Sequence, residues 1–391
     1  LRFSISACDS PVAFSITPMS IFISSRLIAV AFFSDRFSRK NERLTGYIYK
    51  EKFIWILLIV VTAVFAGLRT RYNDTGTYLE SYEYLVNSKF DFSDVEWTFG
   101  GNFGFVIVNI LLKSLGFTNN GFLMVFAIVT YSIYIWFIHK YSTDFLMSIF
   151  LFMCLVFTFP LAAIKQCVAV AFCLLAVDKA INKKWFWFVF WILIAETFHA
   201  YSIIYLIVPL MFFLPWQDKR TVMWIVIFFF AGILLRPMLG TLLETTESLG
   251  KDYTVEEFSG EGVNPFRLLV TLVPLVISFI LRKQINDPYY EYDRQDNVCL
   301  NLSFLNGEIM FIALFGTANY FARLANYFYI FPVIALPRLF NMVKPKWRIP
   351  MKVAAIGCYL FFMWYSNTHS GFNPFDKDFD RIALNEFKWI S

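Results

Sequence analysis

Positively charged side chains at the ends of long apolar runs are the residues of this chain best suited to chemistry. Arg69 and Arg71 follow one apolar run, and an Asp-Thr-Gly turn begins at Asp74. Lys165 and Arg323 each stand between two apolar runs. Arginine binds phosphate oxygens through two parallel hydrogen bonds, whereas lysine supplies a point charge. We therefore expect the four cations to bind a phosphate group near the Asp74 carboxylate. The alternative is that they anchor to lipid headgroups.

Glu196 and His199 form a second candidate group. They are three residues apart, so they share one face of a helix. An ionisable pair inside an apolar segment is costly unless it is paired or hydrated, which favours a functional role. His199 or Asp74 could act as a general base, and the residue types do not choose between them. The alternative for Glu196 and His199 is that they hold two helices together.

Tyrosine and amide side chains beside these residues are candidates for contacts with sugar. They are Tyr78, Gln166, Tyr320 and Tyr327. Aromatic rings next to Arg323 suit a sugar-diphosphate headgroup, because a ring can stack while the cation binds phosphate. A structural bend between two spans is the alternative for this segment. The six cysteines show no zinc-binding spacing, and we expect no metal and no cofactor.

The composition indicates that apolar helices position these residues in a membrane. Of 391 residues, 58% are hydrophobic and 16% are charged, whereas soluble domains average about 25% charged. Backbone groups in lipid must bond within their own segment, so the apolar runs predict helices. We expect an all-α polytopic protein with one membrane domain over 53–366. Residues 1–52 hold an N-terminal segment of uncertain nature and a basic loop, and 367–391 form an outer tail.

The charge pattern predicts which side of the membrane each loop faces. The predicted spans are 53–68, 120–138, 144–163, 166–182, 185–198, 200–215, 221–239, 265–281, 301–321, 325–340 and 350–366, with a twelfth if the N-terminal segment also crosses. If 101–117 crosses, Lys and Arg divide almost evenly between the two sides. If it re-enters, they concentrate on one side, as the positive-inside rule requires. We therefore predict that 101–117 re-enters and that the candidate residues face outward.

Two classes of function are disfavoured by the sequence. The net charge of +5 is modest and spread over short loops, so it reports orientation and not nucleic-acid binding. Neither a GxxxxGKS/T loop nor a GxGxxG loop occurs. An enzyme that takes its substrate from cytoplasmic nucleotides would need such a phosphate-binding loop or a cytoplasmic domain. Any chemistry is therefore expected on the outer side.

Five short motifs occur in a fixed order along roughly 53–375. They are 71–78 (Arg-Tyr-Asn-Asp-Thr-Gly-Thr-Tyr), Gly104-Phe105, Lys165-Gln166, 195–199 (Ala-Glu-Thr-Phe-His) and 323–328 (Arg-Leu-Ala-Asn-Tyr-Phe). Together they resemble the EpsG/Wzy-like family of bacterial exopolysaccharide and capsule polymerases. The family usually has arginine where this chain has Lys165. A lysine offers phosphate a point charge in place of two parallel hydrogen bonds.

The resemblance implies a GT-C-like glycosyltransferase that joins undecaprenyl-pyrophosphate-linked oligosaccharides on the outer side of the bacterial cytoplasmic membrane. The four cations would neutralise the leaving pyrophosphate without a metal, and His199 or Asp74, with Glu196 nearby, would take the proton. Membrane lipids, a flippase and a chain-length regulator are the expected partners, and no nucleic acid is expected. The alternatives are a lipid-linked oligosaccharide flippase or transporter and a membrane O-acyltransferase of surface glycans.

Overall fold

The described part of the chain is helical. The structure is a computed structural model that describes residues 52–69, 72–85, 90–93, 95–98, 100–212, 219, 222–231, 233–234, 263–285, 294–315 and 321–369. No β-strand occurs in these ranges. The predictions for Arg71, Tyr320, residues 1–51 and residues 370–391 lie outside them.

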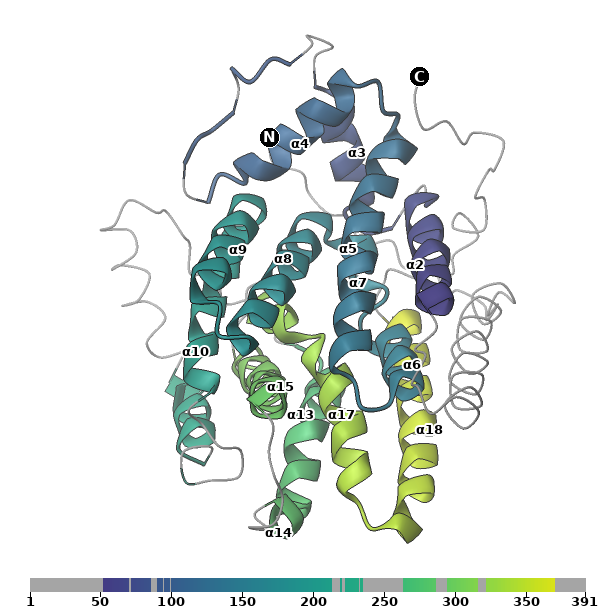
Figure 1. The fold of residues 1–391 in the computed structure, drawn as a ribbon, viewed down its shortest axis with the longest axis vertical. Coiled ribbons are helices and arrows are strands. Elements are labelled where there is room, and N and C mark those ends of the chain that lie inside the picture. Colours follow the sequence, from purple (N-terminus) through teal and green to yellow (C-terminus); the bar gives the residue numbers. More distant parts are fainter. Residues whose placement is uncertain are drawn as a thin grey trace.

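Long helices stand side by side, and α3 and α4 cover one end of the bundle (Figure 1). The first half comprises α2 (Lys52–Gly67), α3 (Thr75–Glu83), α4 (Phe103–Ser114), α5 (Asn119–Tyr141), α6 (Phe145–Leu155), α7 (Phe159–Ala162), α8 (Ile164–Ile181) and α9 (Trp185–Phe198). The second half comprises η1 (Ala200–Ile207), α10 (Val208–Met211), α13 (Pro265–Ile280), α14 (Arg282–Ile285), α15 (Arg294–Ile312), α16 (Arg323–Ala325), η3 (Asn326–Phe328), α17 (Phe331–Met342) and α18 (Pro345–His369).

Small side chains allow the central helices to pack closely. Helix α8 packs on α9, and α2 packs on α5. In α8, Ala169, Ala171 and Ala176 are fully buried. At the end of α2, a Cβ on Gly67 would lie 2.9 Å from the Met124 Cα of α5. Glycine therefore permits the close approach of these two backbones, as small residues do between membrane helices.

Several predicted spans are interrupted in the structure. The predicted span 144–163 is divided into α6 and α7, the span 200–215 into η1 and α10, and the span 325–340 into α16, η3 and α17. Pro160, Pro209 and Pro332 lie in the first turns of α7, α10 and α17. Proline has no N–H to continue a preceding helix but fits the first turn of a new one. These prolines give the physical reason for the interruptions.

The segment predicted to re-enter contains the short helix α4. It has 12 residues and a length of about 18 Å, less than the roughly 30 Å hydrocarbon core of a bilayer. It packs against α9 and lies with α3 at the same end of the bundle (Figure 1). Helix α4 therefore does not traverse the bundle.

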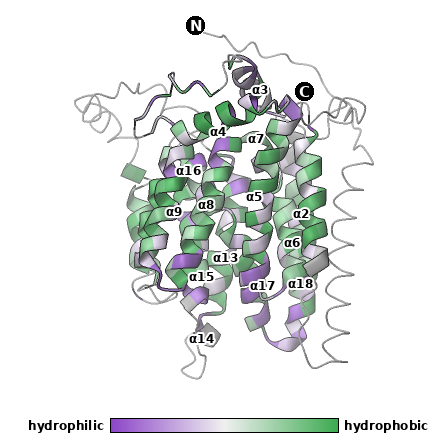
Figure 2. Cartoon of the chain, turned by 45° about the horizontal axis from the view of Figure 1, so that its top comes forward, coloured by the Kyte–Doolittle hydropathy of each residue, from purple (hydrophilic) through white to green (hydrophobic). Residues whose placement is uncertain are grey.

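The helices are apolar over most of their surfaces (Figure 2). Among the described helices, Asn119–Tyr141 and Pro345–Ser366 are long and apolar enough to cross a bilayer. The other apolar helices have 10–17 residues. Hydrophilic residues gather at α3 and near the ends of α15, α17 and α18 farthest from it (Figure 2). This distribution is typical of a protein with a membrane-embedded middle.

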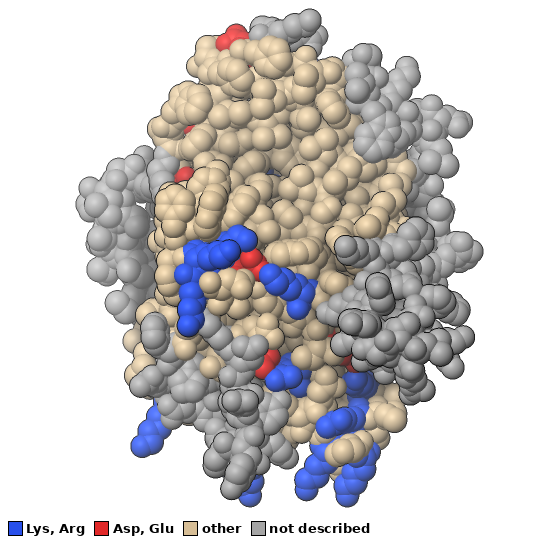
Figure 3. Space-filling view, in the orientation of Figure 1, with Lys and Arg blue, Asp and Glu red and all other residues tan. Residues whose placement is uncertain are grey.

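Basic residues gather toward the end of the bundle opposite α3. On the face drawn in Figure 3, Lys and Arg lie from the middle downward, and the upper part shows few charges. Some form ion pairs: Lys140 bonds Asp178, and Arg338 Nη2 lies 2.5 Å from Asp296 Oδ2. In membrane proteins, the cytoplasmic loops typically carry such an excess of Lys and Arg.

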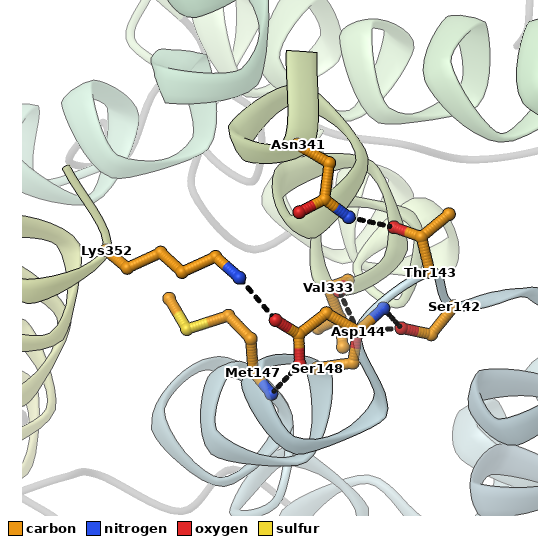
Figure 4. A network of polar contacts seen from close by, with 8 residues as sticks. All are labelled: Ser142, Thr143, Asp144, Met147, Ser148, Val333, Asn341 and Lys352. Carbon is orange, nitrogen blue, oxygen red and sulfur yellow. Dashed lines mark hydrogen bonds and ion pairs between the residues drawn. The ribbon is translucent and has the colours of Figure 1, made fainter. Parts of the chain in front are cut away.

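A polar network at this basic end connects the turn after α5 to two later helices (Figure 4). Asp144 Oδ1 accepts a hydrogen bond from Met147 N at 3.2 Å and so caps α6. Its Oδ2 lies 2.5 Å from Lys352 Nζ of α18. Ser148 Oγ donates to Val333 O of α17 at 2.8 Å. The network therefore fixes α6 against α17 and α18.

Candidate functional site

A cavity of roughly 430 Å³ lies between the start of α3, the starts of α8 and α13, and the end of α18. Its polar lining comprises Tyr72, Asn73, Asp74, Tyr78, Asn102, Thr158, Lys165, Gln166, His199, Arg267, Arg323, Asn326, Tyr329 and Ser366. Its apolar lining from α6 and α18 comprises Met153, Cys154, Leu155, Phe362 and Met363. The mixture suits a ligand with a polar head and an apolar chain.

The start of α3 presents Asp74 and Tyr78 to the cavity. Asn73 has a φ of 44°, a left-handed conformation that asparagine tolerates, and turns the chain into the helix. Asp74 and Tyr78 are four residues apart, so they share one helix face. The Asp74 side chain makes no capping hydrogen bond to α3. Burial, and then the nearby Asp74, raises the pKa of Tyr78 to about 12, so this phenol remains an O–H donor.

The break before α8 places Lys165 and Gln166 at the cavity. Ala163 has non-helical dihedral angles, and α8 begins at Ile164, so Lys165 lies in its first turn. The Lys165 ammonium lies 5.8 Å from the Tyr78 ring centroid and 5.4 Å from that of Phe105. Gln166 Nε2 donates to Arg323 O at 2.6 Å. Gln166, a predicted sugar contact, thus also fixes the backbone that carries Arg323.

His199 lies at the break between α9 and η1. Its backbone is extended, with φ −159° and ψ 118°, which ends α9 and exposes the ring to the cavity. Its Nδ1 is 2.7 Å from the hydroxyl of Tyr327. That bond orients the ring, and Nε2 has no hydrogen-bond partner among the described residues. Tyr327, which the sequence predicts to contact sugar, is fully buried and is not part of the cavity lining. Its hydroxyl contacts His199.

Arg267 of α13 completes the cationic part of the lining. Its Nη2 donates to Asn326 Oδ1 at 2.9 Å, and its guanidinium carbon lies 5.7 Å from the Tyr329 ring centroid. The sequence prediction missed Arg267, although a charged residue inside the predicted span 265–281 is itself a signal of function.

The charges of the lining do not balance. The described lining holds three cations, Lys165, Arg267 and Arg323, and one carboxylate, Asp74. None of the three cations forms an ion pair with a described carboxylate. Cations in partly apolar surroundings are costly without a counter-charge. An anionic ligand would supply it.

Arg69, which the sequence predicts to bind the ligand, does not line this cavity. Its side chain is buried, with 2% exposed. Its Nη1 donates to Ala66 O at 2.5 Å and its Nε to Thr75 Oγ1 at 3.1 Å. Thr75 Oγ1 donates in turn to Leu161 O at 3.2 Å. Arg69 therefore connects the end of α2 to the start of α3, because it bonds a carbonyl in the last turn of α2 and the Thr75 side chain of α3.

Glu196, which the sequence predicts to take part in catalysis, is also outside the lining. Its Oε1 accepts a hydrogen bond from Gly100 N at 2.8 Å, and its side chain is buried. Gly100 has a φ of +84°, which favours glycine. Glu196 and His199 share a helix end, but Glu196 holds the loop that precedes α4 while His199 faces the cavity.

Comparison with known proteins gives one kind of match. A protein-family model described as the EpsG family matches residues 52–377, which is most of the chain. The matched range includes every residue that lines the cavity. No curated protein and no solved structure matches the chain.

Proposed function

Because the chain belongs to the EpsG family, we propose that it is a polysaccharide polymerase, a glycosyltransferase that joins oligosaccharide repeat units carried on undecaprenyl pyrophosphate. One observation carries the proposal: the cavity unites Lys165, Arg323 and His199 with Asp74, and its cations have no ion-pair partner among the described carboxylates. A diphosphate headgroup would supply the missing negative charge.

The reaction proposed for this cavity forms one bond and breaks one. The hydroxyl oxygen of the acceptor sugar attacks the anomeric carbon of the donor sugar, and its proton passes to Asp74 or to His199 Nε2. His199 Nε2 accepts it in the tautomer whose Nδ1–H donates to the Tyr327 hydroxyl. The bond between the anomeric carbon and the phosphate oxygen breaks, and the diphosphate leaves with the electron pair. Lys165 and Arg323 stabilise the charge that develops on it. Fixed cations thus act where many glycosyltransferases use a metal.

The proposed setting is the bacterial cytoplasmic membrane, which the chain crosses several times in a GT-C-like arrangement. The apolar helices and the family match support a membrane protein. The basic end of the bundle would face the cytoplasm. The cavity, at the start of α3, would then open to the outer side. Apolar side chains of α6 and α18 would receive the first part of the lipid chain.

The test is complementation of a strain that lacks the polymerase. We expect Arg323→Ala to insert normally but to leave single repeat units on the lipid carrier, because the leaving diphosphate loses a cation. Lys346→Ala is the matched control, since Lys346 is exposed in the first turn of α18, whereas the other end of this helix lines the cavity. Gel separation of the glycans measures chain length. Normal chains in the Arg323 variant would refute the proposal.

The same cells separate the alternative functions. A polymerase defect leaves single repeats on the outer face, where a glycan-cleaving enzyme added to spheroplasts reaches them. A flippase defect leaves them protected inside. A defect in O-acyl transfer leaves long chains that lack acyl groups, which mass spectrometry of the released glycan detects.

A further inference from the structure

Three side chains at a spacing of three residues line the cavity from one short segment. They are Arg323, Asn326 and Tyr329. The segment passes from α16 into the 3₁₀ helix η3. Asn326 begins η3, Arg323 precedes it in α16 and Tyr329 follows it. Side chains three residues apart share one face of an α-helix and are aligned in a 3₁₀ helix. The three side chains therefore form a row, with about 4.5–6 Å of rise between successive positions.

Arg267 reaches this row from α13. It bonds Asn326 at 2.9 Å and lies over the ring of Tyr329. Helix α13 is itself fixed here, because Asn264 caps it through Phe266 N at 2.8 Å. The Phe266 ring lies against Phe362 of α18, with 5.7 Å between centroids. The Arg267 guanidinium is thus held one position along the row from Arg323.

We propose that Arg267 and Arg323 form a guanidinium pair that binds the two phosphoryl groups of one polyprenyl diphosphate. This inference rests on the proposed function and names a ligand-binding residue for the same site. Each guanidinium fork matches two oxygens of one phosphoryl group. Two arginines without a carboxylate between them repel each other, and a diphosphate turns that repulsion into attraction.

The two arginines have different tasks in this arrangement. Arg267 is ordered before the ligand binds, by the Asn326 amide and the Tyr329 ring. Arg323 is exposed, and its side chain has no hydrogen-bond partner among the described residues. The ordered arginine loses little side-chain entropy on binding, whereas the exposed one can adjust its conformation to the ligand. Beside Arg267, Phe362 and Met363 would contact the first isoprene units.

The test measures affinity with the full-length protein in lipid nanodiscs, titrated with inorganic pyrophosphate, inorganic phosphate and undecaprenyl diphosphate. We expect pyrophosphate to bind more tightly than phosphate. Arg267→Ala should weaken pyrophosphate binding on the order of 10- to 100-fold and should reduce the preference over phosphate. Arg267→Lys should recover part of the affinity. Tighter binding of the lipid form identifies the headgroup as the ligand, and equal binding identifies free diphosphate.

Controls separate a local contact from a change in overall charge or folding. Arg282→Ala removes an exposed arginine at the far end of the same helical region and should leave affinity within about twofold of the unmodified protein. Tyr329→Leu removes the ring that lies against Arg267 and should weaken pyrophosphate binding more than Tyr329→Phe, which keeps the ring. The preference for pyrophosphate over phosphate is a ratio, so partial unfolding does not change it.

The outcomes distinguish this inference from the proposed function. If Arg267→Ala keeps both its affinity and its pyrophosphate preference, the guanidinium pair is refuted, whatever polymer the cells make. If pyrophosphate binding depends on Arg267 but the intact protein makes no polymer, the pair stands and the proposed polymerase activity fails.

Discussion

Glu196 offers a test of the difference between positioning and catalysis at a single residue. Glu196→Gln keeps an acceptor oxygen for Gly100 N, whereas Glu196→Ala leaves that N–H without its partner. We expect the Gln variant to make polymer of normal length. We expect the Ala variant to lose activity several-fold and about 1 kcal/mol of stability, because the loop that carries Asn102 loses its anchor.

Polymer length in cells and thermal unfolding of the purified protein measure the two effects. The contrary outcome is that the Gln and Ala variants are equally inactive and both as stable as the unmodified protein. It would show that the carboxylate itself takes part in the reaction.

Individual residues of the candidate site could be predicted where a polar side chain has no other explanation in an apolar sequence. Asp74, Lys165, His199 and Arg323 were selected in this way, and all four line the cavity. The same signal selected Arg69, Glu196 and Tyr327, whose polar atoms bond other parts of the protein. A sequence shows that a buried polar group needs a partner but not whether that partner is ligand or protein.

The elements that surround the cavity depend on contacts at their far ends. Asp144 both caps α6 and pairs with Lys352 of α18 (Figure 4). We expect Asp144→Ala to destabilise the protein more than Lys352→Ala, by about 1 kcal/mol, because it removes the cap as well as the pair. A double-mutant cycle on unfolding in detergent should give a coupling of up to about 1 kcal/mol.

Lys346→Ala is the control for this cycle, because Lys346 is an exposed neighbour in the same helix. Equal losses for the two single variants would show that the cap contributes nothing. Zero coupling would show that the ion pair does not hold α18 to α6.

At the level of elements, hydropathy predicts the apolar segments well but not their interruptions. The predicted span 166–182 corresponds closely to α8, and 120–138 to the longer α5. The divided spans around η1 and η3 are as apolar as intact helices, so a hydropathy average does not reveal where they break. The prolines in the first turns of α7, α10 and α17 were the available signal. The spacing of three from Arg323 through Asn326 to Tyr329 was the signal that these side chains share one face.

The whole molecule has two chemically different ends, and its proposed activity requires that they face different compartments. Gly76 is suited to carry a probe at the cavity end, because a Cβ there would meet nothing within 4 Å. Lys346 is exposed at the basic end. With the six native cysteines replaced, we expect Gly76→Cys to react with an impermeant maleimide in intact cells. Lys346→Cys should react only after the membrane is permeabilised.

This experiment decides more than orientation. A lipid diphosphate of the outer leaflet can reach Lys165 and Arg323 only if the start of α3 is outside. Moving a charged headgroup through the apolar middle of a bilayer has a high free-energy cost. Labelling of Lys346→Cys in intact cells, with Gly76→Cys protected, would place the cavity in the cytoplasm. The substrate would then have to be polymerised before it crosses the membrane, and the proposed order of export and polymerisation would be reversed.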